Sequence, residues 1–597
     1  MNPALMLPSD RQLDDEEYQS LLRALNWAEG FDLLFVECSP AQASQLIAQT
    51  RADLPHKNID VLSLAEPIDN LYQIVADLPD GDSLNILFIQ GIEKSLVDYI
   101  KPGVGGQGDY YKKDTLPPIL NHLNLQRERF RDSFNICFVF LLARFALKYF
   151  IFRAPDFFDW RSGSLTFPPD RDGLEQELSR LRVSQPEDGS DLTAAECKNR
   201  IFQMNALLEA GTLEPAQQAD VLALQAVLLI EIGEFQAAVA GCDRALHLHP
   251  EHAPAWKNRG WALYNLDRDE EAIASYDKAL AIQPNDSKTW NRRGLALRYL
   301  GRYEEAIASY DKALEIKSHD CEIWYQRGLA LYYSDKYEKA IDSYDRTLKI
   351  EPNFYLAWLN RGRSLRALSR YEDAISSYDK ALEINPELSQ AWDARGLIFR
   401  ILGHYEEAIF SYNRALEINP GDSQIQLYKS YALSHLGLYQ EATSSLDKAI
   451  EYNPESYILW HYRAYSLYYS GQYEEAVYSY DKAIEVMKLK NHYSWGWRST
   501  ITLDSDPSYL AWYGRSLSLC RLGRYQEAIL SFKQFLATPD LYKDSFKLIS
   551  FIIKAATKAV VRGKLSWEGI ISGFAYVLEN IGLRPYPAKQ TTKPFND

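Results

Sequence analysis

The 597-residue chain has few of the residues that organise metal or redox chemistry. Its six cysteines are widely scattered and form no CxxC pair; they are Cys38, Cys137, Cys197, Cys242, Cys321 and Cys520. This scatter excludes the spacing of a zinc or disulfide framework and is typical of small buried residues in a reducing compartment. The sequence therefore predicts no metal site.

Basic residues never form a long run, and the formal net charge is −16. A protein that relies on phosphate contacts needs a basic face, so nucleic acid is disfavoured as the main partner. The first residues, MNPALMLPSDRQLDDEEY, lack the basic and apolar regions of a secretion signal, which favours a cytoplasmic protein.

One apolar stretch, Phe134 to Phe152, is long enough to test as a membrane span. Arg144 and Lys148 lie inside it, and each would cost roughly 2.5–3.5 kcal/mol at a bilayer centre. The pattern instead predicts a buried strand at 134–140 followed by an amphipathic helix, so no membrane association is expected.

Catalytic motifs are also missing. The chain shows no Ser/His/Asp set, no HExxH and no pair of carboxylates in a usable context. We therefore expect no catalytic residue, no enzyme activity and no cofactor.

A period of 34 residues runs through the second half of the chain. An alanine follows a fixed reference position by sixteen residues in eight units, at Ala272, Ala306, Ala340, Ala374, Ala408, Ala442, Ala476 and Ala528. The reference position is usually tryptophan, at Trp256, Trp290, Trp324, Trp358, Trp392, Trp460 and Trp512. Such a period predicts stacked two-helix units, a solenoid with no single globular core.

The period also predicts how the chain is divided. Residues 219–542 hold nine repeats, with an insertion at 491–508 that contains Trp495 and Trp497. Residues 184–218 read as a helical connector, and 543–597 as capping helices with a polar tail. The first 183 residues carry no repeat.

These repeats resemble the tetratricopeptide repeat. Trp, small, Tyr, Ala, Tyr, Ala and Pro follow one another in family order, as in WNRRGLALRYLGRYEEAIASYDKALEI. The resemblance implies a mainly α protein, a right-handed superhelix of helix pairs in which the first helix of each pair lines a concave groove. It places on this groove Tyr264, Arg298, Tyr299, Tyr325, Tyr332, Tyr333, Arg363, Arg366, Arg400, Tyr465, Tyr468, Tyr469 and Tyr513.

Tyrosine offers a large rigid contact area and arginine pairs with carboxylates, and both are typical of binding hot spots. The groove would thus bind a protein or peptide segment, with its acidic groups near the central arginines. The alternative is that several tyrosines only pack between neighbouring first helices. Trp495 and Trp497 in the insertion are candidate contacts as well, although they could equally cover the adjacent repeat.

The first 183 residues have a different pattern. Apolar runs at 31–37, 58–64, 84–90 and 134–140 alternate with helical stretches, which predicts a small α/β domain with a parallel sheet covered by helices on both faces. This order resembles the nucleotide-binding core of STAND-type, AAA-like ATPases, with LNILFIQGIE as the Walker B strand and Glu93 near its acidic position.

The phosphate loop departs from that resemblance. Where GxxxxGK[ST] belongs, the chain reads ECSPAQASQ, with no glycine to let amides approach phosphates and no lysine to meet their charge. The sequence thus predicts a degenerate relative that keeps the sheet and lacks the chemistry.

The resulting hypothesis is a cytoplasmic interaction scaffold, by analogy in bacterial signalling or defence with an effector as partner. One alternative is an ATP-regulated STAND-type switch; another is a self-assembling scaffold. The oligomeric state stays open.

Overall fold

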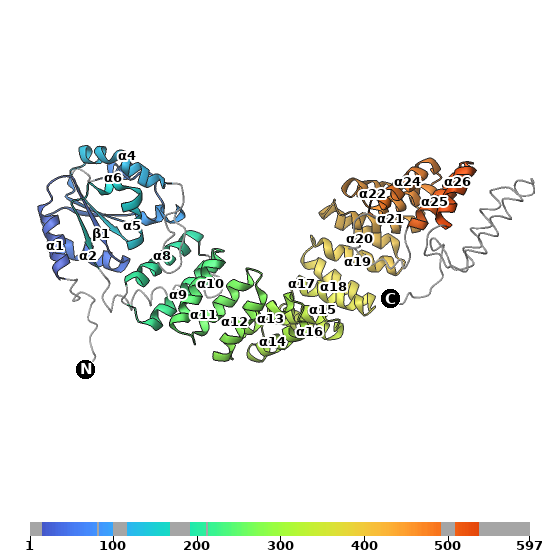
Figure 1. Ribbon diagram of the computed structural model, residues 1–597, viewed down its shortest axis with the longest axis horizontal. Coiled ribbons are helices and arrows are strands. Elements are labelled where there is room, and N and C mark those ends of the chain that lie inside the picture. The colour runs from blue at the N-terminus through green and yellow to red at the C-terminus, as the bar shows by residue number, and fades with distance from the viewer. Residues whose placement is uncertain are drawn as a thin grey trace, which may run out of the picture. The chain divides into compact units, whose positions relative to one another are not determined.

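The computed structural model describes residues 15–79, 83–99, 116–167, 192–210, 213–490 and 508–536. Its contacts group the chain into two compact units, residues 1–330 and 331–597. The tryptophans of the insertion, Trp495 and Trp497, and the predicted capping segment 543–597 lie outside the described residues. Figure 1 shows a sheet-containing region followed by a long run of helices.

The sheet has five strands, all paired in parallel, in the order β2-β3-β4-β1-β5. Their bounds are β1 Asp32–Glu37, β2 Ile59–Ser63, β3 Ile86–Gln90, β4 Cys137–Leu142 and β5 Gly163–Thr166. The predicted parallel sheet is confirmed. β5 was not predicted from the sequence, and its four residues alternate between half-buried and exposed.

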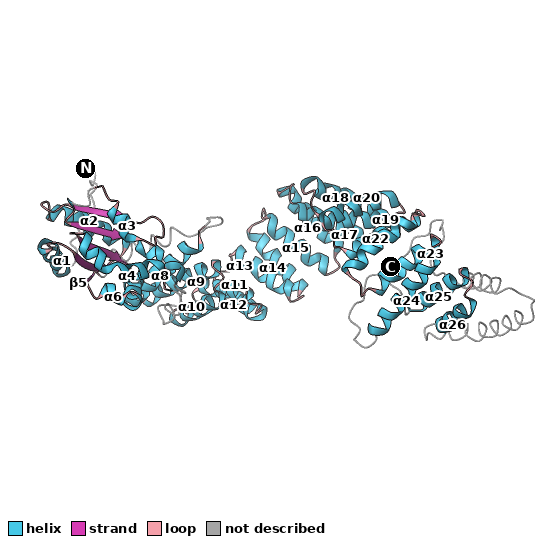
Figure 2. Ribbon diagram, turned by 90° about the horizontal axis from the view of Figure 1, so that it is seen from above, coloured by secondary structure: helices cyan, strands magenta, loops and turns pink. Residues whose placement is uncertain are grey.

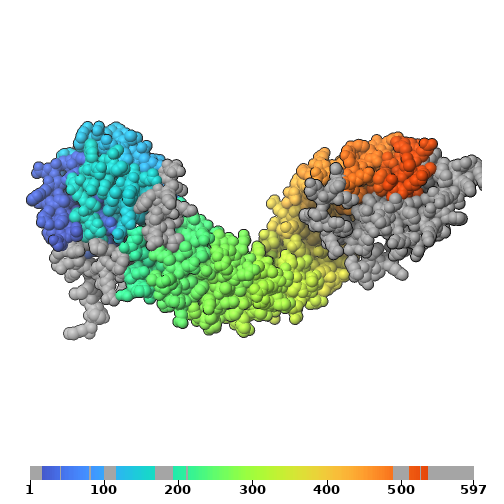
Figure 3. Space-filling model, in the orientation of Figure 1, coloured from blue at the N-terminus to red at the C-terminus, as the bar shows by residue number. Residues whose placement is uncertain are grey.

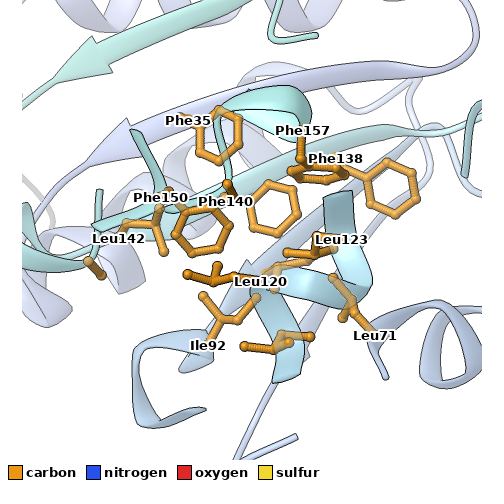
Figure 4. Close-up of a cluster of buried hydrophobic side chains, with 14 of the residues drawn as sticks. Phe35, Leu71, Ile92, Leu120, Leu123, Phe138, Phe140, Leu142, Phe150 and Phe157 are labelled. Carbon is orange, nitrogen blue, oxygen red and sulfur yellow. The ribbon is translucent and has the colours of Figure 1, made fainter. Parts of the chain in front are cut away.

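Helices cover both faces of this sheet, because β1 alternates its buried side chains. Leu34 and Val36 pack with α1 (Asp15–Trp27) and α2 (Pro40–Asp53). Leu33 and Phe35 face the other way, into a phenylalanine-rich core shown in Figure 4. That core includes residues of α3 (Leu71–Ala76), α4 (Pro118–Ser133), α5 (Arg144–Arg153) and α6 (Pro155–Phe158).

The apolar stretch from Phe134 to Phe152 divides as the charges within it predict. Its first part leads into β4, whose six residues are all buried, and its second part belongs to α5. Among the described residues, no helix is long and apolar enough to cross a membrane.

The repeats form helix pairs, which Figure 2 shows as a succession of cyan helices. α8 (Ala194–Ala210) precedes α9 (Pro215–Glu231) and α10 (Phe235–Leu248). The first helices of the later pairs are α11 Ala253–Tyr264, α13 Ser287–Tyr299, α15 Cys321–Tyr333, α17 Tyr355–Ala367, α19 Ser389–Ile401, α21 Ser423–His435, α23 Tyr457–Tyr469 and α25 Ser508–Arg521. Their second helices are α12 Asp269–Ile282, α14 Tyr303–Ile316, α16 Tyr337–Ile350, α18 Tyr371–Ile384, α20 Tyr405–Ile418, α22 Tyr439–Tyr452, α24 Tyr473–Lys490 and α26 Tyr525–Leu536.

A glycine facing a tyrosine holds the two helices of several pairs together. A Cβ on Gly362 would lie 2.5 Å from the ring of Tyr378, and one on Gly396 would lie 2.7 Å from Tyr412. Both tyrosines are fully buried. The recurrent glycine is therefore required because the ring occupies the space of a side chain.

An arginine of each first helix joins three helices. Arg395 donates from Nε to Asp379 of the preceding repeat (2.7 Å) and from Nη1 to Ser411 of its own second helix (2.8 Å). We call this Arg–Asp–Ser set the clasp. Its arginine recurs as Arg259, Arg293, Arg327, Arg361, Arg395, Arg463 and Arg515, each paired with an aspartate.

The reference tryptophan adds a further tether. The indole Nε1 of Trp392 donates to the carbonyl of Pro386 at 2.9 Å, and the Arg395 guanidinium lies 5.6 Å from the centre of its ring. The tryptophan thus fixes the turn that leads into each first helix.

The seventh repeat lacks all of these features at once. Asn413 and Lys429 stand where the clasp has aspartate and arginine, Gln426 replaces the tryptophan, and Ser430 and Leu446 replace glycine and tyrosine. Burial lowers the pKa of Lys429, and nearby Lys448 lowers it further.

Within the first unit, α8 joins the sheet domain to the repeats. Phe202 of α8 lies 4.8 Å from Phe145 of α5, and Lys198 pairs with Asp98 at 3.4 Å. In Figure 3 the cyan surface of the sheet domain passes into the green surface of the early repeats.

Candidate functional site

The first helices of successive repeats lie next to one another, with α17 beside α19, α19 beside α21 and α21 beside α23. We call the surface that they form the first-helix face. All the groove residues predicted from the sequence lie on these helices, four of them in the first unit and nine in the second.

In the first unit, the face carries Tyr264, Arg298, Tyr299 and Tyr325. Tyr299 is 68% exposed, and its ring meets Tyr264 edge-on at 5.7 Å. Burial raises the pKa of Tyr264 to about 12, so this hydroxyl stays protonated at neutral pH. Tyr325 is only 8% exposed. Three of the four residues thus offer surface to a ligand.

In the second unit, the tyrosines differ in the same way. Tyr333 and Tyr469 are 52% and 51% exposed, and Tyr332 is half-buried. Half-buried Tyr465 and Tyr468 contact Tyr469, with ring centres 4.6 and 5.2 Å away. Tyr513, by contrast, is buried. Tyr325 and Tyr513 therefore fit the alternative that some tyrosines pack between helices.

The three arginines of the second unit lie on two neighbouring helices, α17 and α19. Arg363 donates to Asn360 (3.2 Å) and to Gln390 (3.3 Å). The Arg400 guanidinium lies 5.3 Å from the ring centre of Tyr428 and 5.1 Å from that of Tyr431. The Nε atoms of Arg298, Arg366 and Arg400 are buried and have no hydrogen-bond partner among the described residues.

Asp393 lies among these arginines and was missed from the sequence. Burial raises its pKa to about 6, nearby Asp422 adds to the rise, and Arg366, Arg363 and Arg400 oppose it. Its Oδ1 is buried without a hydrogen-bond partner among the described residues. A single aspartate on a charged helix gives no signal in the sequence, because such residues are usually solvated.

The carboxyl edge of the sheet is the second place where a ligand is expected in a parallel α/β fold. Here the N-terminus of α2 follows β1, and its own residues satisfy it. The Ser39 side chain accepts from the Gln42 amide (3.2 Å), and the Gln42 side chain accepts from the Ser39 amide (3.0 Å). Pro40 has no N–H to offer. These amides are thus unavailable to a phosphate.

A cavity of about 260 Å³ lies at this edge, lined among others by Cys38, Gln90, Glu93 and Gln203. Burial raises the pKa of Glu93, and its Oε2 is buried without a hydrogen-bond partner among the described residues. Burial also raises the pKa of Cys38 to about 12, and nearby Glu93 and Glu37 add to the rise. The thiol is therefore no nucleophile at neutral pH.

α8 covers this edge, which no sequence pattern indicated. Its Gln203 lines the cavity, and its Glu209 pairs with Lys148 and, at 3.5 Å, with Arg144. Arg144 in turn lies 3.8 Å from Glu37 at the end of β1. The edge that would hold a ligand in an open sheet is used for contact with the repeats.

The comparisons with known proteins concern the repeats. Tetratricopeptide-repeat models match residues 224–287, 325–389, 389–422 and 275–308, and a model described as TPR repeat matches 294–334. A model of the protein prenyltransferase alpha subunit repeat matches residues 439–470. No curated protein matches the chain.

Several solved structures are similar to parts of the chain. MamA is 25% identical over 28% of this chain and 96% of its own, with a TM-score of 0.27. YrrB, a TPR protein with an unusual peptide-binding site, is 25% identical over 30% of this chain and 91% of its own, with a TM-score of 0.28. A tetratricopeptide repeat protein from Parabacteroides merdae is 20% identical over 39% of this chain and 93% of its own, with a TM-score of 0.32.

Proposed function

We infer that this chain, whose helix pairs form a tetratricopeptide-repeat solenoid, is a scaffold that binds a protein or peptide segment on its first-helix face. One observation carries this proposal. Tyr299, Tyr333 and Tyr469 follow or align with one reference position and keep more than half of their surface in water. Large aromatic residues that recur in this way on one face are typical of binding surfaces.

We also propose that the sheet domain is a catalytically silent relative of STAND-type ATPases. A parallel sheet with a small cavity at its carboxyl edge supports the relationship. The self-capped N-terminus of α2 and the absence of a phosphate-binding lysine speak against the ATP-regulated alternative. Calorimetric titration with ATP tests this part: we expect no binding, and micromolar binding that depends on Glu93 would favour the switch.

The setting is proposed by analogy: a cytoplasmic protein of bacterial signalling or defence, with an effector as its partner. The sheet domain would then fix the first repeats through α8, and the first-helix face would hold the ligand.

Selection of binders from a random peptide library on the full chain tests the scaffold function. We expect binders whose affinity falls by about tenfold in Tyr333→Ser and Tyr469→Ser, because exposed aromatic contacts are lost. Tyr452→Ser is the matched control, since Tyr452 is 60% exposed at the end of a second helix. A library that yields no binder, or binders that are insensitive to both substitutions, would remove the first-helix face from the proposal.

A further inference from the structure

The arginines Arg363, Arg366 and Arg400 form a basic cluster in an acidic protein. The chain has a net charge of −16, yet here three guanidinium groups surround a single carboxylate, that of Asp393. The other nearby carboxylate, Asp422, accepts hydrogen bonds from the Gln424 and Ile425 amides at the start of α21. The cluster therefore carries an excess of positive charge.

Hydrogen bonding within the cluster is incomplete. Oδ1 of Asp393 and the Nε atoms of Arg366 and Arg400 are all buried, and none has a hydrogen-bond partner among the described residues. Leaving buried polar groups unpaired is unfavourable, and this holds most of all for charged groups. Arg366 and Arg400 occupy the same position in consecutive repeats, so their guanidinium groups lie on neighbouring helices.

A planar carboxylate is the ligand that this arrangement fits. Guanidinium groups bind carboxylates through paired N–H donors, and the excess positive charge favours an anion over a neutral group. The tyrosines that flank Arg400, Tyr428 and Tyr431, offer aromatic surface to the adjoining part of a peptide.

We propose that the arginine cluster binds a carboxylate of the protein segment on the first-helix face, and that Asp393 competes with this carboxylate for the same guanidinium groups. The inference rests on the proposed scaffold function. It makes Asp393 a specificity-determining residue, because a ligand has to displace the influence of an internal carboxylate.

The competition depends on pH. Charged or titratable groups face Asp393 from four helices: Arg363 and Arg366 from α17, Arg400 from α19, Tyr412 from α20 and Asp422 at the start of α21. Because the pKa of Asp393 is about 6, its charge is lost as the pH falls from 7.5 to 5.5. The aspartates and glutamates of a ligand, with pKa values of about 4, stay ionised over this range. An acidic segment therefore binds more tightly at pH 5.5.

The test uses the full chain and three fluorescein-labelled probes: amidated hexaglutamate, amidated hexaglutamine, and hexaglutamine with a free C-terminal carboxylate. Fluorescence anisotropy measures each affinity. Preference for the first probe over the second assigns the site to acidic side chains, and preference for the third assigns it to a C-terminus. Equal affinity for all three overturns the proposal.

Four variants complete the experiment. We expect Arg366→Gln and Arg400→Gln to weaken binding of the preferred probe by about tenfold, and Arg370→Gln, an exposed arginine paired with Asp373, to leave it unchanged. Asp393→Asn should tighten binding at pH 7.5 and abolish its increase towards pH 5.5. A gain in affinity does not arise from misfolding, so this variant stays informative if the arginine variants unfold.

The failure of this inference differs from that of the scaffold function. Library binders that depend on Tyr333 and Tyr469 but show no preference for acidic residues would overturn the carboxylate site and leave the scaffold function standing. Unchanged affinity in Asp393→Asn would overturn the competition.

Discussion

The junction that leads into the seventh repeat differs from the junctions around it. Between the fifth and sixth repeats, Arg395 joins Asp379, Ser411 and the ring of Trp392. Between the sixth and seventh, Asn413 and Lys429 take the places of aspartate and arginine. The apolar contacts persist at that second junction, since Ala415, Leu416 and Ile425 pack in one cluster.

This difference separates two contributions that act together elsewhere. Apolar packing alone keeps the repeats in register, because the seventh repeat stacks without a clasp. Polar and aromatic tethers then add stability at selected junctions. In a solenoid the stability of each junction is nearly a local property, so the two contributions can be measured separately by hydrogen exchange of the helices involved.

The largest effect is expected from removing a clasp. Arg395→Ala loses two hydrogen bonds from a charged donor and a mostly buried side chain, and should lower the free energy of local unfolding of α19 and α20 by about 2.5 kcal/mol. Lys429→Ala, the matched change at the unclasped junction, should cost less than about 0.5 kcal/mol. Equal losses in the two variants would show that the clasp contributes nothing.

The contact between glycine and tyrosine gives the next largest effect. Gly362→Ala forces a methyl group into the ring of Tyr378 and should destabilise α17 and α18 by about 2 kcal/mol. Ser430→Ala, at the same position of the seventh repeat, removes only a hydroxyl bonded to the Leu427 carbonyl and should cost about 1 kcal/mol. Hydrogen exchange of each helix pair measures both, and a neutral Gly362→Ala would contradict the steric argument.

The unpaired carboxylate of Asp393 contrasts with the clasped carboxylate of Asp379. Asp393 has a pKa of about 6, above its usual value, so its charged form destabilises the fold, and stability falls as the pH rises from about 4 to 6. Asp393→Asn should therefore stabilise α19 by about 1 kcal/mol at pH 7.5, less than the shift alone implies because the amide is also buried. The gain should vanish below pH 4, and a gain independent of pH would rule out this cause.

The smallest effect is expected from building the missing clasp. Ser445 already stands at the serine position of the seventh repeat, where it is buried. Asn413→Asp with Lys429→Arg should therefore stabilise the junction of α20 and α21 by about 0.5 kcal/mol. The single substitutions provide the control, since a double-mutant cycle isolates the pair, and the absence of coupling between them would refute a rebuilt clasp.

Much of this fold could be predicted because the repeat multiplies weak signals. The unit 321–354 predicts two helices separated by a turn at Ser334–Asp335, and α15 and α16 end and begin on either side of it. The strands β1 to β4 were visible as apolar runs. β5 was not, because four residues with only partial burial resemble a loop.

The candidate site could be predicted only in part. Repeat positions placed the exposed tyrosines on the first helices, but they did not separate Tyr299 from buried Tyr325. Asp393 lies one residue after a reference tryptophan, as Tyr325 does, yet its role depends on the three arginines around it. Such a relation between residues 27 to 30 positions apart exists only after folding.

The N-terminus of α2 has a consequence for the history of the sheet domain. Ser39 and Gln42 cap each other, and Pro40 removes one amide. Regaining a phosphate loop would require the loss of this reciprocal cap, a new lysine and several glycines, and each single step would weaken the helix without a compensating ligand. The change is therefore practically irreversible by stepwise substitution, and descendants of this protein should diversify through their repeats.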